Sequence, residues 1–195
     1  PTSAPTSADV AFKLPNADGS ANEVLKTDGS GNLSFAADSG GKFASYAIIA
    51  DQKTAGTNGG GFTSGAWRVR DLNTELADAD GIVSISSNKF TLQAGTYLVK
   101  ASVPGYNVTR HMARLENDTD GTVVAYGTSE YTKSTDYVTT RSIVIARFTI
   151  AGAKAFEISH RCQDDKATDG FGVQSNSQFS VDNEQYTVVE IYKES

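Results

Sequence analysis

Apolar and polar side chains alternate with a period of two along several stretches of this chain, and this pattern restricts the fold to β-strands. The stretch YLVKASV places on one face Tyr97, Val99, Ala101 and Val103. In KAFEISHRC one face carries Phe156, Ile158, His160 and Cys162, and the other Glu157, Ser159 and Arg161. VIARFTI groups Val144, Ala146, Phe148 and Ile150.

Further strands are expected near residues 43–50, 66–72, 82–85, 88–92, 110–116, 122–127 and 186–193. Gly, Asp and Asn turns separate the strands, and no long stretch has a helical period. The sequence therefore predicts an all-β fold, an antiparallel two-sheet jelly roll of about ten short strands, which hides most strand edges.

Residues 1–40 differ in character from residues 41–195, so we expect an extended, turn-rich stem followed by one jelly-roll domain. The run KTDGSGNLSF reads as a hairpin, because Asp28–Gly29 tolerates the positive φ angles of a tight turn. An isolated hairpin is only marginally stable in water. We therefore expect the stem to be buried against other copies of the chain or against a larger particle. Its candidate contact residues are Val24, Leu25, Leu33 and Phe35.

Charge and hydropathy disfavour two kinds of partner. The net charge is −6, from 17 basic and 23 acidic residues, so nucleic-acid binding is not expected. No apolar run approaches the roughly 20 residues of a membrane helix, so no membrane insertion is expected. With one cysteine, Cys162, the chain forms no internal disulfide.

Two acidic turns have partial calcium-loop spacing, and a further loop is acidic. Residues 116–121 and 78–81 carry part of a calcium-loop pattern but lack its closing Glu, so both are interpreted as hairpin turns and no metal site is predicted. The loop CQDDKATDG contains Asp164, Asp165 and Asp169, which can bind a cation or a sugar hydroxyl, although a solvated loop is the preferred interpretation.

Catalytic signals are weak. Only His111 and His160 can act as imidazole bases, and the G-x-S-x-G pattern is absent. His160 and Cys162 share a strand face with Phe156 and Ile158, which indicates a buried histidine beside an inert cysteine. We expect no enzymatic activity and no cofactor.

Aromatic residues near the expected loops suit carbohydrate, because a ring stacks on the sugar face while polar groups bind hydroxyls. The candidate ligand-binding residues, besides the three aspartates, are Tyr106, Asn107, Tyr131, Tyr137 and Arg141. Residues 129–141 are expected to form an apical variable loop. Packing in the core or between subunits is the alternative, and it is preferred for Trp67.

The stretch FTLQAGTYLVKASVPGY, with its F-x-x-x-x-G-x-Y-x-V pattern, resembles part of the C1q/TNF-like jelly rolls. The similarity is closer to the C1q-like tip domains of tail-fibre and other virion proteins of bacteriophages, marine phages especially. DQKTAGTNGGGFTSGAWRVRDLNT, FEISHRC, GFGV and EIYKE resemble that group, and LPNADGSANEVLKTDGSGNLSF resembles the linker repeats before such tips. The chain has no Gly-X-Y collagen stem, which separates it from complement C1q.

This resemblance implies a homotrimer on the virion surface, on a tail fibre or the capsid exterior. One hypothesis is a short fibre or tail-tip adhesin that binds host cell-surface glycan. The alternative is a capsid or tail decoration protein that docks on other virion proteins through residues 1–40. A polysaccharide depolymerase is the third hypothesis, but no spacing predicts its carboxylate pair.

Overall fold

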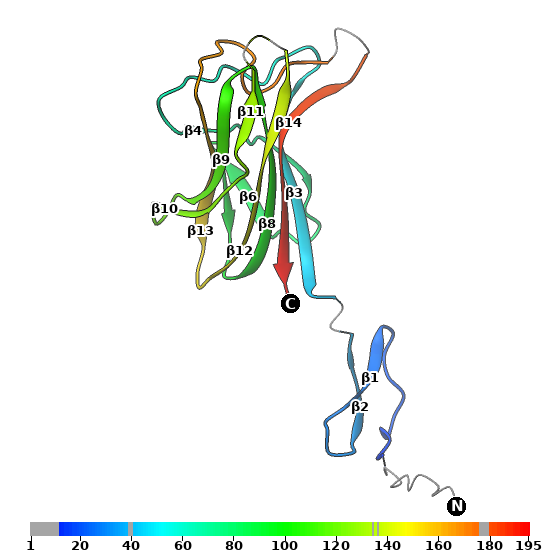
Figure 1. The fold of residues 1–195 in the computed structure, drawn as a ribbon. Helices are drawn as coiled ribbons and strands as arrows, with labels where there is room; N and C mark the ends of the chain where they lie inside the picture. Colours follow the sequence, from blue (N-terminus) through cyan, green and yellow to red (C-terminus); the bar gives the residue numbers. More distant parts are fainter. Residues whose placement is uncertain (1–11, 39–40, 134, 136, 176–179) are drawn as a thin grey trace, which may run out of the picture. The chain divides into compact units, whose positions relative to one another are not determined.

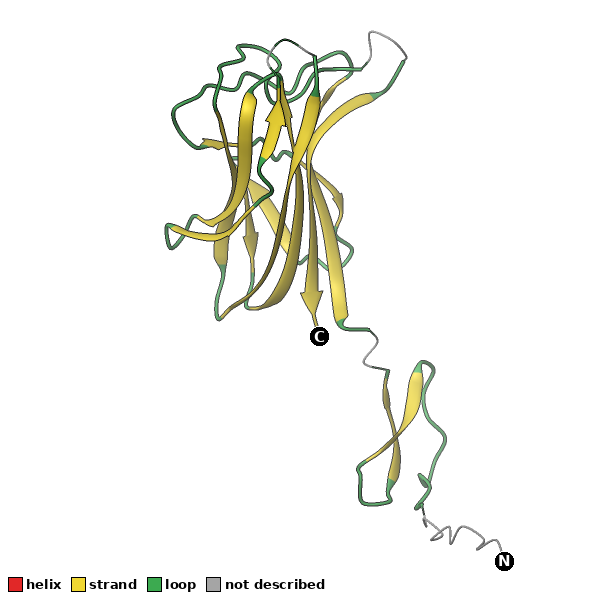
Figure 2. Ribbon diagram, viewed as in Figure 1, coloured by secondary structure: helices red, strands yellow, loops and turns green. Residues whose placement is uncertain are grey.

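The computed structural model describes residues 12–38, 41–133, 135, 137–175 and 180–195, and every regular element within them is a β-strand (Figures 1 and 2). The chain divides into two compact units, residues 1–41 and 42–195. None of the described residues belongs to a helix long and apolar enough to cross a membrane.

The larger unit is a sandwich of two antiparallel sheets (Figure 1). The first sheet has the strand order β12-β8-β14-β3-β5. Its strands are β3 (Phe43–Thr54), β5 (Thr74–Ala77), β8 (Gly95–Tyr106), β12 (Thr139–Ile150) and β14 (Asn183–Glu194). The second sheet has the order β10-β9-β13-β7-β6, with β11 paired to β9 and β4 paired to β13. Its strands are β4 (Arg68–Val69), β6 (Val83–Ser86), β7 (Lys89–Leu92), β9 (Thr109–Asn117), β10 (Thr122–Tyr126), β11 (Glu130–Thr132) and β13 (Lys154–Cys162).

The strand order makes this sandwich a jelly roll. The chain changes sheet between β7 and β8, between β8 and β9, and again on each side of β13. Consecutive long strands therefore face each other across the core instead of pairing, as in a double Greek key. The expected antiparallel two-sheet jelly roll is confirmed.

The strand faces predicted from the alternation of apolar and polar residues agree with the structure. The core between the sheets contains the apolar series of β8, β12 and β13, with Phe90 stacked on Phe156 at 5.7 Å between ring centroids. The strand expected at 66–72 is reduced to Arg68–Val69, and the next residue, Arg70, is fully buried. Two short strands were not predicted, β5 and β11, which lack a clear alternation and each pair with one neighbour.

The smaller unit contains the expected hairpin, formed by β1 (Glu23–Thr27) and β2 (Leu33–Ala37). The Asp28 carboxylate closes its turn by accepting hydrogen bonds from the backbone N–H of Ser30 at 2.7 Å and of Asn32 at 3.1 Å. Leu25 pairs with Phe35 across the strands, whereas Val24 pairs with Ala36. Because the side-chain period is two, Val24 lies on the opposite face from Leu25, Leu33 and Phe35. The four candidate contact residues therefore lie on two faces of the hairpin, and their burial against other copies of the chain or a larger particle stays a prediction.

Candidate functional site

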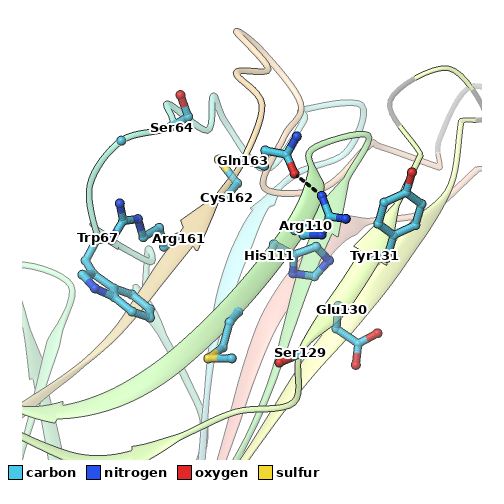
Figure 3. Close-up of a pocket in the computed structure, with 12 residues that line it drawn as sticks. Ser64, Trp67, Arg110, His111, Ser129, Glu130, Tyr131, Arg161, Cys162 and Gln163 are labelled. Carbon is cyan, nitrogen blue, oxygen red and sulfur yellow. Dashed lines mark hydrogen bonds between the residues drawn. The ribbon is translucent and has the colours of Figure 1, made fainter.

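An open pocket of about 860 Å³ lies on the outward face of the second sheet, where β11, β9, β13 and β4 run side by side (Figure 3). Its volume falls within the range of small-molecule sites. It is lined by Ser64, Gly65, Trp67, Arg110, His111, Met112, Ser129, Glu130, Tyr131, Arg161, Cys162 and Gln163. These residues come from the loop before β4, from β9, from β11 and its approach, and from the end of β13.

Aromatic rings form two opposite sides of the pocket. Trp67 stands at the β4 side and Tyr131 at the β11 side, as Figure 3 shows. With three inter-strand spacings between β4 and β11, the sides are separated by roughly 14 Å. Tyr131 is exposed, and the Arg110 Cζ atom lies 5.8 Å from the centre of its ring. The pocket can therefore hold an extended ligand between two rings.

Trp67 is held in place by its neighbours. The Arg114 Cζ atom lies 4.2 Å from the centre of the indole ring, and the Tyr126 ring centroid lies 6.1 Å away. The Arg114 guanidinium is in turn bound to Glu116 and to Ser159 Oγ. Because the indole is fixed before any ligand arrives, less side-chain entropy is lost on binding.

Polar side chains occupy the middle of the pocket. Arg110 Nη1 donates a hydrogen bond of 2.8 Å to Gln163 Oε1, which is drawn in Figure 3. Arg161 lies on the neighbouring strand β13, and Glu130 on β11. The Glu130 carboxylate accepts a hydrogen bond of 2.7 Å from Thr128 Oγ1. This set supplies both donors and acceptors for the hydroxyl groups of a ligand.

The floor of the pocket is uncharged at neutral pH. Burial lowers the pKa of His111 to about 4 and, together with nearby Arg70, holds the pKa of His160 well below its usual value. His111 Nε2 also lies 2.9 Å from Thr140 Oγ1. Burial raises the pKa of Cys162 to about 12, so this residue is a thiol and not a thiolate. At neutral pH the Cys162 thiol is therefore a poor nucleophile, and the two buried imidazoles are poor bases.

The loops around the pocket rest on a small second core of Phe62, Val108, Cys162 and Phe171. Phe62 and Lys166 exchange backbone hydrogen bonds of 2.7 and 2.9 Å, which tie the loop before β4 to the loop after β13. A Cβ atom on Gly61 would overlap the backbone of Ala167. The glycine run 59–61 therefore lets the two loops approach closely enough to support one side of the pocket.

Of the predicted ligand-binding residues, only Tyr131 lines this pocket. Tyr106 and Asn107 are buried, and Asn107 is bonded to the backbone of Val138 through both its N–H and its side-chain oxygen at 3.1 Å. Their side chains position the β8–β9 connection and are inaccessible to a ligand. For these two residues the expectation is corrected, because the backbones of Val138 and Gly170 bond to this turn and both side chains are buried.

The remaining candidates do not line the pocket. Asp164 accepts a hydrogen bond from Thr109 Oγ1, and Asp165 accepts one of 2.5 Å from Ser64 N, so both act as loop braces. Asp169 lies near Lys166, with 3.9 Å between Oδ1 and Nζ. Arg141 lies on the first sheet, where Nη1 donates to the carbonyl of Tyr186 at 2.9 Å. Tyr137 is 80% exposed in the connection between β11 and β12.

Trp67, Arg110 and Arg161 were missed as site residues. Trp67 had been interpreted as a packing residue. The outward face of KAFEISHRC included Arg161, and TRHMARLEN places Arg110, Met112 and Arg114 together on one face of β9. Arginines on the solvent face of adjacent strands are the signal that could have indicated this site.

The calcium-like segments form turns. Asp78 accepts hydrogen bonds from the N–H groups of Ile82 and Val83 at 2.8 and 3.0 Å. In the β9–β10 turn, Asp118 pairs with Lys89 at 2.7 Å and Asp120 with Lys154 at 2.6 Å. Among the described residues, no group of three or more His, Cys, Asp or Glu side chains is arranged to hold a metal ion.

No protein-family model and no curated protein matches this chain. Among solved structures, the globular domain of a zebrafish complement 1qA protein is similar, with 14% identity, coverage of 76% of this chain and 96% of that chain, and a TM-score of 0.47. Murine APRIL at pH 8.0 has 8% identity, 76% and 98% coverage, and a TM-score of 0.47. PRD1 vertex protein P5 has 13% identity, 80% and 100% coverage, and a TM-score of 0.45.

Proposed function

We propose that this chain is a homotrimeric structural protein of a phage virion surface, a short fibre or tail-tip adhesin that binds host cell-surface carbohydrate in the pocket between Trp67 and Tyr131. The observation that carries the binding role is the pocket itself, which presents two aromatic rings on opposite sides of a hydrogen-bonding centre. Rings stack on the apolar faces of sugars, and the centre takes up their hydroxyl groups. The virion setting is supported by the resemblance of the sequence to phage tip domains.

Self-association is supported by the outward face of the first sheet. A solvated face of an antiparallel sheet normally carries polar residues. Here Ile145, Lys100, Glu190 and Ile48 lie in one row across four strands, and Ile145 is 58% exposed. The exposed apolar face is defined as Tyr46, Ile48, Leu98, Ile143, Ile145 and Tyr192. Its burial between copies of the chain removes this surface from water.

A trimer would strengthen weak single sites. Three linked pockets that reach the same cell surface raise the overall avidity without any new contact. We propose binding and not catalysis as the role, because Glu130 is the single carboxylate among the described lining residues and glycoside hydrolysis uses a pair.

The second candidate is a decoration protein that docks on other virion proteins through residues 1–40. It is favoured by the hairpin, in which Val24 is 37% and Leu25 48% exposed on opposite faces. Such surface on an isolated hairpin is available for a protein partner.

Adsorption of the labelled full chain to host cells tests the adhesin. We expect saturable binding that competes with phage adsorption and that falls at least about tenfold in Trp67→Ala and Tyr131→Ala. Tyr137→Ala is the matched control, since this tyrosine is exposed but does not line the pocket. Cell binding that depends on Tyr137 and not on Tyr131 would exclude the pocket. Absence of cell binding, with re-attachment to stripped virions through residues 1–40, would favour the decoration protein.

A further inference from the structure

Two arginines in the pocket lack an acidic partner. Arg110 donates to the neutral amide of Gln163, and neither Arg110 nor Arg161 forms an ion pair with any residue that the structure describes. Two other arginines of the same sheets are neutralised, whereas the exposed Arg68 and Arg141 donate to backbone carbonyls and form no ion pair with any described residue. Arg114 is paired with Glu116, and Arg147 binds Glu194 through two hydrogen bonds of 2.7 Å.

The lack of an acidic partner for Arg110 and Arg161 matters because the chain as a whole is acidic. With 23 acidic and 17 basic residues, carboxylates are the more abundant group on its surface. The pocket nevertheless contains two positive charges against one negative charge, Glu130. A planar guanidinium with several N–H donors is suited to a carboxylate or to the oxygens of a sulfate ester.

The register allows the two guanidinium groups to act together. Met112 on β9 pairs with Arg161 on β13, and Gln163 N donates to the carbonyl of Arg110 at 2.8 Å. Arg110 and Arg161 are therefore diagonal neighbours on one sheet face, at a separation that long side chains can bridge. Figure 3 shows Arg110 beside Tyr131 and Arg161 beside Trp67.

We propose that the pocket selects a saccharide that carries an anionic group, a carboxylate or a sulfate ester, which Arg110 and Arg161 bind while Trp67 and Tyr131 stack on the flanking rings. This inference rests on the proposed carbohydrate-binding function and adds the class of sugar.

The test is calorimetric binding of the full chain to oligogalacturonate and to its methyl ester, which has the same rings without the charge. Sulfated and unsulfated dextran form the second pair of probes and distinguish sulfate from carboxylate. The variants are Arg110→Gln, Arg161→Gln and the double variant. Lys154→Gln is the matched control, because it removes one positive charge from the same strand β13 at its other end.

We expect a charged probe to bind more tightly than its neutral counterpart, with an affinity that falls as salt rises. Each arginine variant loses roughly tenfold to a hundredfold in affinity for that probe, and Lys154→Gln keeps it. Equal binding of charged and neutral probes, unchanged in the arginine variants but lost in Trp67→Ala, would overturn this inference and leave carbohydrate binding intact. No binding of any probe, together with no adsorption to cells, would overturn both.

Discussion

The Nδ1 atom of His111 lies 2.9 Å from the Nε2 atom of His160, so that two imidazole rings on neighbouring strands share one hydrogen bond inside the jelly roll. One ring must donate and the other accept, which is possible only while at least one of them is neutral. Arg70 is fully buried in the same region, with its guanidinium donating to the carbonyl of Phe171 at 2.8 Å and to Thr187 Oγ1 at 2.9 Å. A proton added to either histidine therefore meets an existing positive charge.

Acid is expected to destabilise the fold through this pair. The pKa of His111 is lowered to about 4, chiefly by burial, with Glu130 opposing and Arg70 adding to the shift. Below the unfolded value near 6.5 the unfolded chain binds more protons than the folded chain, so stability is lost as the pH falls. Between about pH 7 and pH 5 we expect a loss of about 1 to 2 kcal/mol from His111, measured by urea unfolding.

The variant His111→Gln separates this effect from other titrations. Glutamine keeps a hydrogen-bonding side chain but does not titrate, so the loss between the same two pH values should shrink whatever the stability of the variant. An equally steep loss in His111→Gln would show that the histidine pair is not its source.

Cys162 is expected to be unreactive in the folded protein. Its side chain is buried and its pKa is raised to about 12, first by burial and then by Asp165 and Asp164. The thiolate is the reactive form, and its population at neutral pH is therefore very small. A chromogenic disulfide reagent should label the chain only after urea is added, and rapid labelling of the folded protein would contradict the burial.

The faces of the long strands could be read from the sequence because alternation is a local property. In β13 each inward residue differs from its outward neighbours, and β8 and β12 repeat the pattern. The burial of Arg70 could not be read in this way. Its acceptors are Thr187 Oγ1 and the carbonyls of Pro104 and Phe171, and only the closed fold brings these segments together.

The candidate site was only partly predictable for the same reason. Tyr131 was identified because an aromatic residue in a polar stretch is conspicuous by itself. Trp67 becomes a pocket residue only because β4 pairs with β13, which brings the loop before β4 beside Arg161. Tyr106 and Asn107 have equally polar neighbours in the sequence, but the fold buries both, because the turn after β8 bonds to the distant residues Val138 and Gly170.

Gly172 is expected to be intolerant of any side chain. Its φ angle is +144°, and a Cβ atom there would overlap the ring of Tyr186, whose hydroxyl donates to the carbonyl of Thr57 at 2.6 Å. Backbone strain and overpacking together predict that Gly172→Ala loses about 2–4 kcal/mol in the free energy of unfolding. Differential scanning calorimetry should show a Tm lower by roughly 5–15 °C.

Gly152→Ala is the control for this substitution. Gly152 lies between β12 and β13, and a Cβ atom there would have no atom within 4 Å. Its Tm should stay close to that of the unchanged protein. A comparable fall in both variants would mean that the loss reflects glycine replacement in general and not the contact with Tyr186.

Ile145→Asp is expected to break the proposed trimer. Ile145 is 58% exposed in the middle of the exposed apolar face, next to Lys100 and in line with Glu190 and Ile48. A charge placed between copies of the chain must be desolvated, which opposes assembly by several kcal/mol. Light scattering after size exclusion should give three times the chain mass for the unchanged protein and one chain mass for the variant.

Val123→Asp introduces the same charge at an exposed position of β10 on the other sheet and should remain trimeric. If both variants assemble like the unchanged protein, the copies do not meet through this face, whereas a monomeric unchanged protein would remove the trimer itself.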